Sequence, residues 1–492
     1  MKYVIGIDQS TQGTKALLFD ERGSMVKRVD TPHRQIINEQ GWVSHDMEEV
    51  LQNTLQVAKD VVLGAGIDKA DVVAVGISNQ RETSVLWDKE SGKALNHAIV
   101  WQCSRAAEIC KRPKIAAAAE MIRERTGIFL SPYFPAAKIA WLLEHTEGAK
   151  EKAAAHTICH GTVDSFLVYR LSREHVYRTD YSNASRTQLF DLQDLTWNAK
   201  ICELFGIDPE NMPQVTDSDG DYGTTDLGGF LEHPVPIHAA MGDSHAALFG
   251  QGCFESGMTK ATYGTGSSVM MNVGEKPVFS PHGVVSSIGW GMQGKVTYVL
   301  EGNINYTGAV ISWLKDQVQL ISSAKETAAL AKAANPEDRT YLVPAFTGLG
   351  APYWKDDATA ILTGMTRTTG KNEIVKAAVE CIAYQIADIV EIMGKDSGLP
   401  LAQLRVDGGP TGNEYLMQFQ SDLLRIPVSV APIEELSGMG AAYAAGIGCG
   451  LYRKEEIFRT EGRTTYTPKA DAKAVEEKKA GWSNAVAQVM GA

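Results

Sequence analysis

The chain has 492 residues, of which 44% are hydrophobic and 22% charged, and its 47 Lys and Arg against 59 Asp and Glu give a formal net charge of −12. This composition is typical of a globular protein of about two or three domains, and it argues against a disordered, coiled-coil or collagen-like chain. The acidic balance argues against a nucleic-acid-binding or membrane-binding surface, because both need a basic face.

The cysteines and the apolar runs indicate the cellular compartment of the protein. There are seven cysteines, an odd number, and none of them forms a C-x-x-C pair. That pattern argues against a disulfide framework or a zinc site and favours a reducing compartment. The start of the chain lacks the apolar core of a signal peptide because Asp8 interrupts it, and no apolar run reaches about 18 residues. We therefore expect a cytoplasmic protein.

The first half of the chain opens with a predicted strand over 2–7, a polar turn over 9–14 and a second strand over 15–20. A helical pattern over 47–63 and a buried strand over 72–77 follow. Strands then alternate with helical patterns, as at 136–145 and 162–171. Strands mixed with helices in this way predict an α/β fold.

The second half begins with a similar hairpin over 259–273, which holds the turn Tyr263-Gly264-Thr265-Gly266-Ser267. We interpret this as a weak internal duplication whose halves join near 245–255, giving domains over 1–247 and 248–492. The alternative is coincidence, since Gly/Thr turns between strands are common. A Gly/Ala-rich stretch over 438–451 predicts a packed helix, and 469–479 a solvated one.

Two polar turns have the composition of a phosphate site. The turn over 8–15 supplies a carboxylate, hydroxyls, a glycine and a lysine, and the turn over 264–267 supplies a hydroxyl and glycines. Phosphates bind backbone N–H groups, hydroxyls and cations, and Mg²⁺ on those phosphates binds one or two carboxylates. The alternative is an ordinary hairpin turn. Neither turn matches the P-loop pattern, so a P-loop is excluded.

A third Gly-rich segment, over 406–413, lies between a predicted strand over 404–406 and a helix over 414–424. Glycine at such a junction lets a flat ring approach the backbone, so the segment is a candidate purine or ribose site. The alternative is a helix N-cap made by Thr411 or Asn413.

The segment 79–83 follows the strand over 72–77 and brings Arg81 beside Glu82. An arginine fork and a carboxylate suit vicinal hydroxyls, which both donate and accept hydrogen bonds. The alternative is a surface ion pair worth about 0–1 kcal/mol. Trp101 and Tyr133 would suit the carbon face of a sugar, although core packing is the commoner role of an aromatic residue.

Asp243 follows an apolar run over 236–240 and precedes a helical segment over 244–249. A carboxylate at a strand end can act as a general base on an alcohol, and His245 could do so as well. Because His245 falls within the helix, Asp243 is the better placed. The alternative is that Asp243 only caps that helix.

These segments together resemble the FGGY family of carbohydrate kinases. The family patterns stand at 133–145 (YFPAAKIAWLLEH) and from 360 through Gly364 to Glu373, Ala377 and Glu380. Within the family the chain most resembles the glycerol kinases, and the resemblance covers about residues 3–452. The residues that carry it lie at 41–42, 79–83, 99–103, 161–164, 179–186, 346–354, 405–409 and 416–423.

The resemblance implies two actin-like, ribonuclease-H-type domains that flank a cleft, and ATP-dependent, Mg²⁺-dependent phosphorylation of a terminal hydroxyl. It also implies a homo-oligomer, a dimer or tetramer. By position it implies Asp243 as the catalytic base and Asp8 as the metal-associated carboxylate. The implied nucleotide contacts are Thr11, Gln12, Lys15, Thr265, Gly266, Gly308, Gly409 and Asn413, and the implied polyol contacts are Arg81, Glu82, Trp101, Tyr133, Asp243, Ser244 and Ser268.

The sequence departs from the glycerol kinase pattern at two places in the implied polyol site. Ser244 stands where Gln is usual, and Ser268 stands where Phe is usual. Both changes shorten the side chain, so a longer polyol or a ketose, such as erythritol or xylulose, is the alternative substrate. The segment 226–234 also lacks the loop by which some bacterial glycerol kinases bind fructose 1,6-bisphosphate. Outside the kinases, the alternatives are an actin-like ATPase and a catalytically silent sugar-binding regulator.

Overall fold

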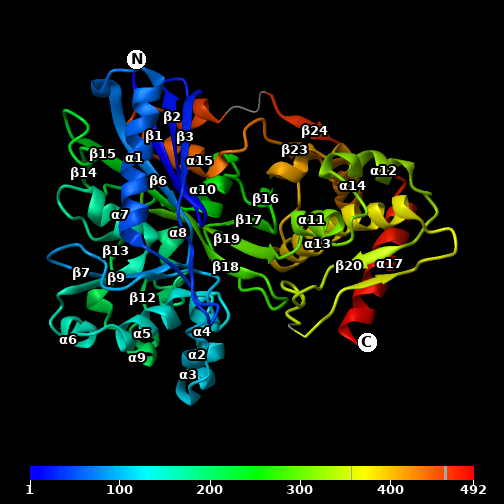
Figure 1. Cartoon of the computed structure of the whole chain (residues 1–492), viewed down its shortest axis with the longest axis horizontal. Helices are drawn as coiled ribbons and strands as arrows, with labels where there is room; N and C mark the ends of the chain where they lie inside the picture. Colours follow the sequence, from blue (N-terminus) through cyan, green and yellow to red (C-terminus); the bar gives the residue numbers. More distant parts are fainter. Residues whose placement is uncertain (356, 459–461, 492) are drawn as a thin grey trace.

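The structure is a computed structural model that describes residues 1–355, 357–458 and 462–491. Two large mixed sheets lie side by side and dominate the molecule (Figure 1). The first has six strands in the order β14-β15-β6-β1-β2-β3. Its strands are β1 (Tyr3–Gln9), β2 (Gly13–Asp20), β3 (Met25–Pro32), β6 (Val72–Asn79), β14 (Thr224–Thr225) and β15 (Val235–Gly242).

The second sheet has seven strands in the order β18-β19-β17-β16-β22-β23-β24. They are β16 (Thr259–Tyr263), β17 (Ser267–Gly274), β18 (Val285–Met292), β19 (Lys295–Ile304), β22 (Leu404–Asp407), β23 (Val428–Val430) and β24 (Thr464–Tyr466). The hairpin predicted over 259–273 is therefore β16 and β17.

The two sheets share one topology. In the first, β1 pairs antiparallel with β2 and parallel with β6, which pairs parallel with β15. In the second, β16 pairs antiparallel with β17 and parallel with β22, which pairs parallel with β23. The orders β3-β2-β1-β6-β15 and β19-β17-β16-β22-β23 correspond strand for strand. This repeat confirms the predicted α/β fold built from two similar halves.

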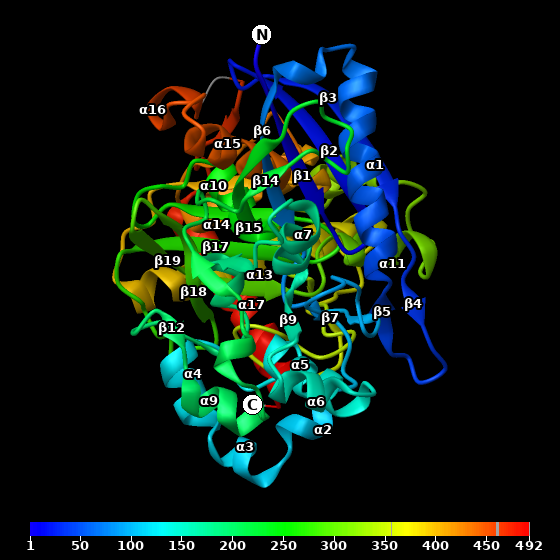
Figure 2. The ribbon, with the colours of Figure 1, turned by 90° about the vertical axis from the view of Figure 1, so that its left-hand side faces the viewer.

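The strands of the first sheet are apolar because both faces are covered. All seven residues of β1 are buried. Helices α1 (Met47–Ala65) and α7 (Val163–Leu171) pack on one face, and α10 (Asp243–Gly250) and α15 (Leu436–Gly448) on the other (Figure 2). We call this sheet with these helices the first lobe. Helix α15, predicted over 438–451, thus comes from the second half of the sequence.

Helix α10 lies between the two sheets. It packs on β15 and β6 of the first sheet and contacts β17 and β18 of the second. The opposite face of the second sheet is covered by α13 (Lys371–Ser397), and we call this sheet with α13 and its neighbouring helices the second lobe. The domain boundary expected at 247/248 falls inside α10, so the first and second halves of the sequence are in close contact here.

Smaller elements complete both lobes. A five-stranded sheet, β4-β5-β8-β7-β9, extends the first lobe, and no described helix is long and apolar enough to cross a membrane. The remaining strands are β4 (Ile36–Ile37), β5 (Val43–His45), β7 (Ser84–Asp88), β8 (Ala98–Ile99), β9 (Ile158–Thr162), β10 (Arg178–Asp180), β11 (Phe190–Asp191), β12 (Thr196–Trp197), β13 (Gln214–Thr216), β20 (Tyr341–Val343) and β21 (Ile361–Thr363). The remaining α-helices are α2 (Ala107–Cys110), α3 (Pro113–Ala117), α4 (Ala119–Thr126), α5 (Pro135–His145), α6 (Ala149–Ala154), α8 (Tyr181–Ala184), α9 (Ala199–Phe205), α11 (Gly308–Asp316), α12 (Thr327–Ala333), α14 (Glu414–Leu424), α16 (Lys454–Ile457) and α17 (Ala472–Met490).

Candidate functional site

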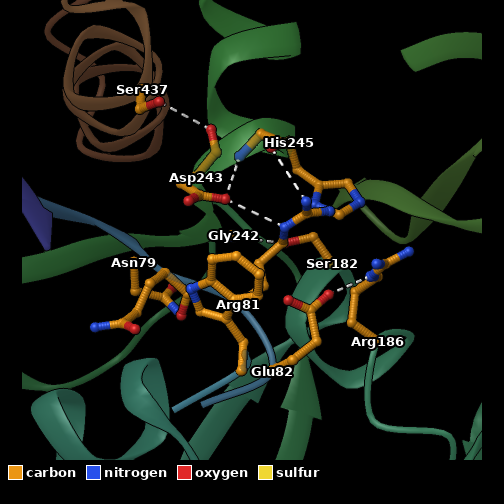
Figure 3. A network of polar contacts seen from close by, with 12 residues as sticks. Asn79, Arg81, Glu82, Ser182, Arg186, Gly242, Asp243, His245 and Ser437 are labelled. Carbon is orange, nitrogen blue, oxygen red and sulfur yellow. Dashed lines mark hydrogen bonds and ion pairs between the residues drawn. The ribbon is translucent and has the colours of Figure 1, made fainter. Parts of the chain in front are cut away.

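Asp243 is the first residue of α10 and directly follows β15, so its carboxylate stands at the end of the strand that lies between β14 and β6 in the first sheet. Its backbone is held on both sides. The N–H of Gly242 donates to the Ser182 hydroxyl at 2.9 Å, and the Ser437 hydroxyl donates to the Asp243 carbonyl at 3.0 Å (Figure 3). The Asp243 side chain is 36% exposed. It is therefore a rigidly placed carboxylate that a small molecule can reach.

His245 lies two residues further into α10 and is buried. Its Nε2 is 3.1 Å from the Ser287 hydroxyl on β18. Burial, with Arg81 nearby, holds the pKa of His245 well below its usual value. The histidine therefore faces the second sheet, buried and only weakly basic, which favours Asp243 over His245 as the base.

Arg81 follows β6 and is buried beside Asp243 (Figure 3). Its Nε is 3.2 Å from Asp243 Oδ1, and its Nη2 donates to the Ser244 hydroxyl at 3.1 Å. Its two Nη atoms bind both oxygens of Glu301, each at 2.7 Å. The sequence suggested an arginine fork open to vicinal hydroxyls, but here a carboxylate of the second sheet occupies that fork.

Glu82 likewise does not pair with Arg81. Its Oε1 accepts a hydrogen bond from Arg186 Nε at 2.6 Å. Arg186 in turn lies 3.1 Å from Glu301 through Nη1 and stacks over the ring of Phe134. Burial alone would raise the pKa of Glu301, but Arg186 and Arg81 outweigh it and hold that pKa well below its usual range.

These contacts form one chain of alternating charge, which we call the ion-pair chain. It runs from Glu82 through Arg186, Glu301 and Arg81 to Asp243. The first four residues are at most 6% exposed. Both ends of the chain are carboxylates that the resemblance places against the polyol.

The aromatic residues join this region to the first polar turn. The rings of Trp101 and Tyr133 meet edge to face with centroids 5.6 Å apart. The indole N–H of Trp101 donates to the Thr11 hydroxyl at 2.9 Å. Thr11, expected to contact phosphate, and Trp101, expected to contact polyol, therefore lie next to each other, whereas Gln12 is exposed.

Asp8 lies near the end of β1, where its Oδ1 accepts a hydrogen bond from Ser78 at 3.0 Å. Burial raises its pKa to about 6; Lys15, with Nζ 3.9 Å away, opposes this shift, and Asp243 adds to it. Lys15 also pairs with Glu435 at 2.7 Å. A bound cation would stabilise the Asp8 carboxylate, so the residue fits Mg²⁺ chemically.

The rest of the Mg²⁺ shell would have to come from the nucleotide. Among the described residues there is no group of three or more His, Cys, Asp or Glu side chains that could hold a metal ion. Mg²⁺ in phosphotransfer sites is commonly held by one or two carboxylates together with phosphate oxygens and water. A single buried carboxylate at Asp8 is compatible with that arrangement.

The second polar turn packs against the start of α11. The N–H of Gly308 donates to the Gly264 carbonyl at 2.9 Å, and the N–H of Ala309 donates to the Thr265 carbonyl at 3.0 Å. A Cβ on Gly308 would stand 2.7 Å from that Gly264 oxygen, and one on Gly266 would stand 2.4 Å from a β19 carbonyl. These two glycines therefore allow close backbone packing, and Thr265 is exposed at the tip.

A cavity of about 700 Å³ in the second lobe is lined by Gly308, Gly409 and Asn413. Asn413 is also a helix cap, since its Oδ1 accepts from the Leu416 N–H at 3.1 Å while its Nδ2 donates to Thr327 at 3.0 Å. The two interpretations of the Gly-rich segment are thus compatible. Other lining residues are Ile311, Ser312, Lys315, Ala328, Val379, Ile382 and Leu416.

Ser268 on β17 pairs with Asn303 of β19, and two residues along each strand Met270 pairs with Glu301. Because side chains two apart share a sheet face, Ser268 lies on the face that carries Glu301. Its hydroxyl is buried and has no hydrogen-bond partner among the described residues. The structure thus brings Ser268 to the side of the second sheet that faces α10.

Two residues of this site were not singled out from the sequence, Arg186 and Glu301. Arg186 ends a polar run over 179–186, but nothing local shows that it reaches Glu82, 104 positions away. Glu301 gave a usable signal, because it is the only carboxylate in strand β19 and directly follows the buried apolar pair Val299-Leu300. A charge inside a buried strand points to a partner, though not to which one.

Comparison with known proteins identifies the class. Residues 3–250 match the N-terminal domain of the FGGY family of carbohydrate kinases, and residues 259–449 match its C-terminal domain. The chain belongs to this family. That result decides between the three classes of protein considered from the sequence in favour of the kinase.

Individual relatives are similar over their whole length. Glycerol kinase 1 of Thermotoga maritima is 46% identical over 490 residues, which covers 99% of each chain. Glycerol kinase of Alkaliphilus oremlandii is 44% identical over 487 residues, 99% of this chain and 97% of the other. The crystal structure of Plasmodium falciparum glycerol kinase with ADP superposes with a TM-score of 0.93 at 33% identity and covers 99% of this chain and 98% of the other. A xylulose kinase from Lactobacillus acidophilus, at 20% identity and a TM-score of 0.88 over 100% of this chain and 99% of the other, shares the fold.

Proposed function

We propose that the protein transfers a phosphoryl group from ATP to a terminal hydroxyl of a small polyol, and that glycerol is the first candidate substrate. The observation that carries the proposal is the placement of Asp243. This carboxylate is fixed at a strand end, partly exposed, and 3.2 Å from a buried arginine whose two Nη atoms bind Glu301. The similarity to glycerol kinases supports glycerol as the acceptor.

In the proposed reaction Asp243 accepts the proton of the terminal hydroxyl. The alcohol oxygen attacks the γ-phosphorus in line, the bond between that phosphorus and the β–γ bridging oxygen breaks, and ADP leaves. The positive charge of Arg81, with Nε 3.2 Å from the Asp243 carboxylate, attracts that carboxylate and helps to hold it in place. Glu82, Trp101 and Tyr133 form the opposite side of the polyol site.

The nucleotide is proposed to occupy the second lobe. The adenosine would fill the cavity at Gly409 and Asn413, and the phosphates would extend between the turn at Thr265 and Gly266 and the turn at Thr11, Gln12 and Lys15. Asp8 would hold Mg²⁺ there together with phosphate oxygens; the ion, when bound, offsets the charge of the phosphates.

A longer polyol or a ketose is the second candidate, and the unpartnered Ser268 hydroxyl favours it. An additional substrate hydroxyl could pair with Ser268, whereas a shorter substrate leaves that group unsatisfied. The double variant Ser244→Gln with Ser268→Phe should then shift preference towards glycerol, by about 10- to 200-fold for one lost methylene-scale contact. If that variant leaves the ratio of kcat/KM values unchanged, the two serines do not set specificity.

The test of the proposal is ADP release in a coupled assay with glycerol, erythritol, pentitols, pentuloses and dihydroxyacetone. Release that depends on a polyol supports the kinase, and the substrate with the highest kcat/KM identifies the acceptor. ADP release at the same rate without any polyol would refute the proposed function. Assembly into a dimer or tetramer stays a prediction, which light scattering on the purified protein would measure.

A further inference from the structure

Glu301 occupies an unusual position between the lobes. It projects from β19 of the second sheet, yet both of its charged partners, Arg81 and Arg186, belong to the first half of the sequence. Its side chain is 0% exposed. Both of its oxygens are occupied by the guanidinium groups of Arg81 and Arg186, so Glu301 would act on a substrate through these two residues.

Stability alone does not account for this arrangement. Removing a carboxylate and two guanidinium groups from water costs several kcal/mol per ion, and their mutual attraction often only balances that cost. A well-packed apolar side chain could fill the same space without the penalty. The ion-pair chain therefore calls for a role beyond holding the lobes together.

The contacts of Glu301 indicate that role. Its two oxygens fix the fork of Arg81, with both N–O distances at 2.7 Å, and this holds the guanidinium beside Asp243. The Arg81 Nε lies 3.2 Å from Asp243 Oδ1, an ion pair without the geometry of a hydrogen bond. The same carboxylate lies 3.1 Å from Arg186 Nη1 as an ion pair, while Arg186 Nε donates a hydrogen bond to Glu82 at 2.6 Å. A planar guanidinium bound through one edge has its other edge fixed as well.

We propose that Glu301 is a positioning residue for phosphoryl transfer, which orients Arg81 towards Asp243 and Arg186 towards Glu82 from across the lobe boundary. The proposal rests on the proposed function. It means that the polyol site of the first lobe reaches its working geometry only when the second sheet, on the nucleotide side of the molecule, lies against it. Glu301 thus connects the position of the second lobe to the geometry of the base.

The test is Glu301→Gln, which keeps the shape of the side chain and removes its charge. Arg81 then lacks its counter-ion and pairs more closely with Asp243, so the base is drawn away from the alcohol. We expect kcat to fall about 10- to 100-fold, in keeping with the cost of misplacing a reacting group by about 1 Å. The KM for ATP should stay within about twofold, because the nucleotide cavity does not include Glu301.

A matched control is Glu380→Gln in α13. Glu380 is also buried in the second lobe and pairs with Lys478 at 2.9 Å and with the Tyr415 hydroxyl at 2.7 Å. The chemical change is the same, so a general effect of losing a buried charge should appear in both variants. We expect Glu380→Gln to lower the melting temperature and to leave kcat near that of the unaltered chain.

Glu301→Asp keeps the charge on a shorter side chain and should recover part of the lost kcat. If Glu301→Gln does not fold, Arg186→Lys tests the inference instead. Lysine cannot contact Glu82 and Glu301 at once as a guanidinium does, so the KM for the polyol should rise at least about tenfold. A kcat within threefold of the unaltered chain for Glu301→Gln, or an equal loss in Glu380→Gln, would overturn the inference. Polyol-independent ADP release by the unaltered chain would instead overturn the proposed function itself.

Discussion

At the scale of single residues, Asp243 and Asp8 are carboxylates at strand ends of the same sheet that differ in exposure. The side chain of Asp243 is 36% exposed, whereas that of Asp8 is 9% exposed and its pKa is raised to about 6. Environments that separate two carboxylates in this way commonly divide their roles. Here the division favours Asp243 as the proton acceptor and Asp8 as the carboxylate that needs a cation.

Replacing Asp243 with Asn should abolish most phosphoryl transfer and leave the fold intact. The amide cannot accept the alcohol proton, so kcat should fall about 10²- to 10⁴-fold. ADP affinity by calorimetry and the melting temperature should be close to those of the unaltered chain. The control Asp60→Asn in α1, far along the sequence from the site, should retain full kcat. Near-normal turnover of Asp243→Asn would exclude this residue as the base.

Replacing Asp8 with Asn should stabilise the protein at neutral pH while it removes activity. The pKa of Asp8 is about 6 in the folded state against 3.8 for an exposed aspartate, so ionisation costs the folded state free energy on the order of 2–3 kcal/mol above about pH 7. This cost shrinks as the pH falls through 6 towards 3.8, because the folded state then keeps its proton.

Urea unfolding at about pH 7.5 and about pH 5 measures this effect. The stability gain of Asp8→Asn should be largest at the higher pH and about half as large at the lower one. Equal free energies of unfolding for the variant and the unaltered chain at pH 7.5 would show that burial does not disfavour this carboxylate.

At the scale of elements, the sequence predicted those whose signals are local. The strand expected over 2–7 is β1, the helix expected over 47–63 is α1, and the helix over 414–424 is α14 with the same bounds. Asp243 could be found in the same way, since a strand and then a helix could be predicted around it. Each signal needed only a window of about ten to twenty residues.

Features that depend on contacts between distant segments were not accessible from the sequence. The Arg81–Glu301 pair joins positions 220 apart, and no local pattern specifies such a partner. The docking of α15 on the first sheet is a similar case, because its Gly/Ala composition predicts close packing but not the surface to which it docks. Composition thus indicates that a segment is buried, but only the topology of the fold determines which surface the segment packs against.

Glycines in α15 let this helix pack closely against its neighbours. Gly440 is the glycine of α15 with the closest contact to α10. A Cβ there would stand 1.9 Å from the Ala246 carbonyl oxygen. Gly440→Ala should therefore lower the free energy of unfolding by about 1–3 kcal/mol, because α10 and α15 must separate. In Gly64→Ala the nearest atom is the flexible Lys27 Cε at 3.2 Å.

Both substitutions replace a helical glycine with alanine and share the same gain in helix propensity, close to 1 kcal/mol. Gly64→Ala should therefore be neutral or stabilising, and the difference between the two variants isolates the cost of helix separation. Urea unfolding of the two proteins measures it. Equal stabilities would show that the contact between α10 and α15 relaxes without cost.

At the scale of the whole molecule, the two lobes hold different parts of the proposed site. Asp243 and the proposed polyol contacts other than Ser268 lie in the first lobe, and the cavity at Gly409 and Asn413 lies entirely in the second lobe. Phosphoryl transfer requires these parts to meet and water to be excluded, because water would otherwise accept the phosphoryl group. Glu301 and Arg81 already join the lobes, so a closing motion would turn about this contact.

Binding of both ligands should therefore bring the lobes closer together. Small-angle scattering should give a smaller radius of gyration with a non-hydrolysable ATP analogue and glycerol together than with either ligand alone, since only the pair contacts both lobes. In Glu301→Gln the decrease should be smaller, because the contact about which the lobes turn is weakened. If calorimetry shows both ligands bound while the radius is unchanged, the lobes do not move, and exclusion of water must come from side chains near Trp101 and Tyr133 alone.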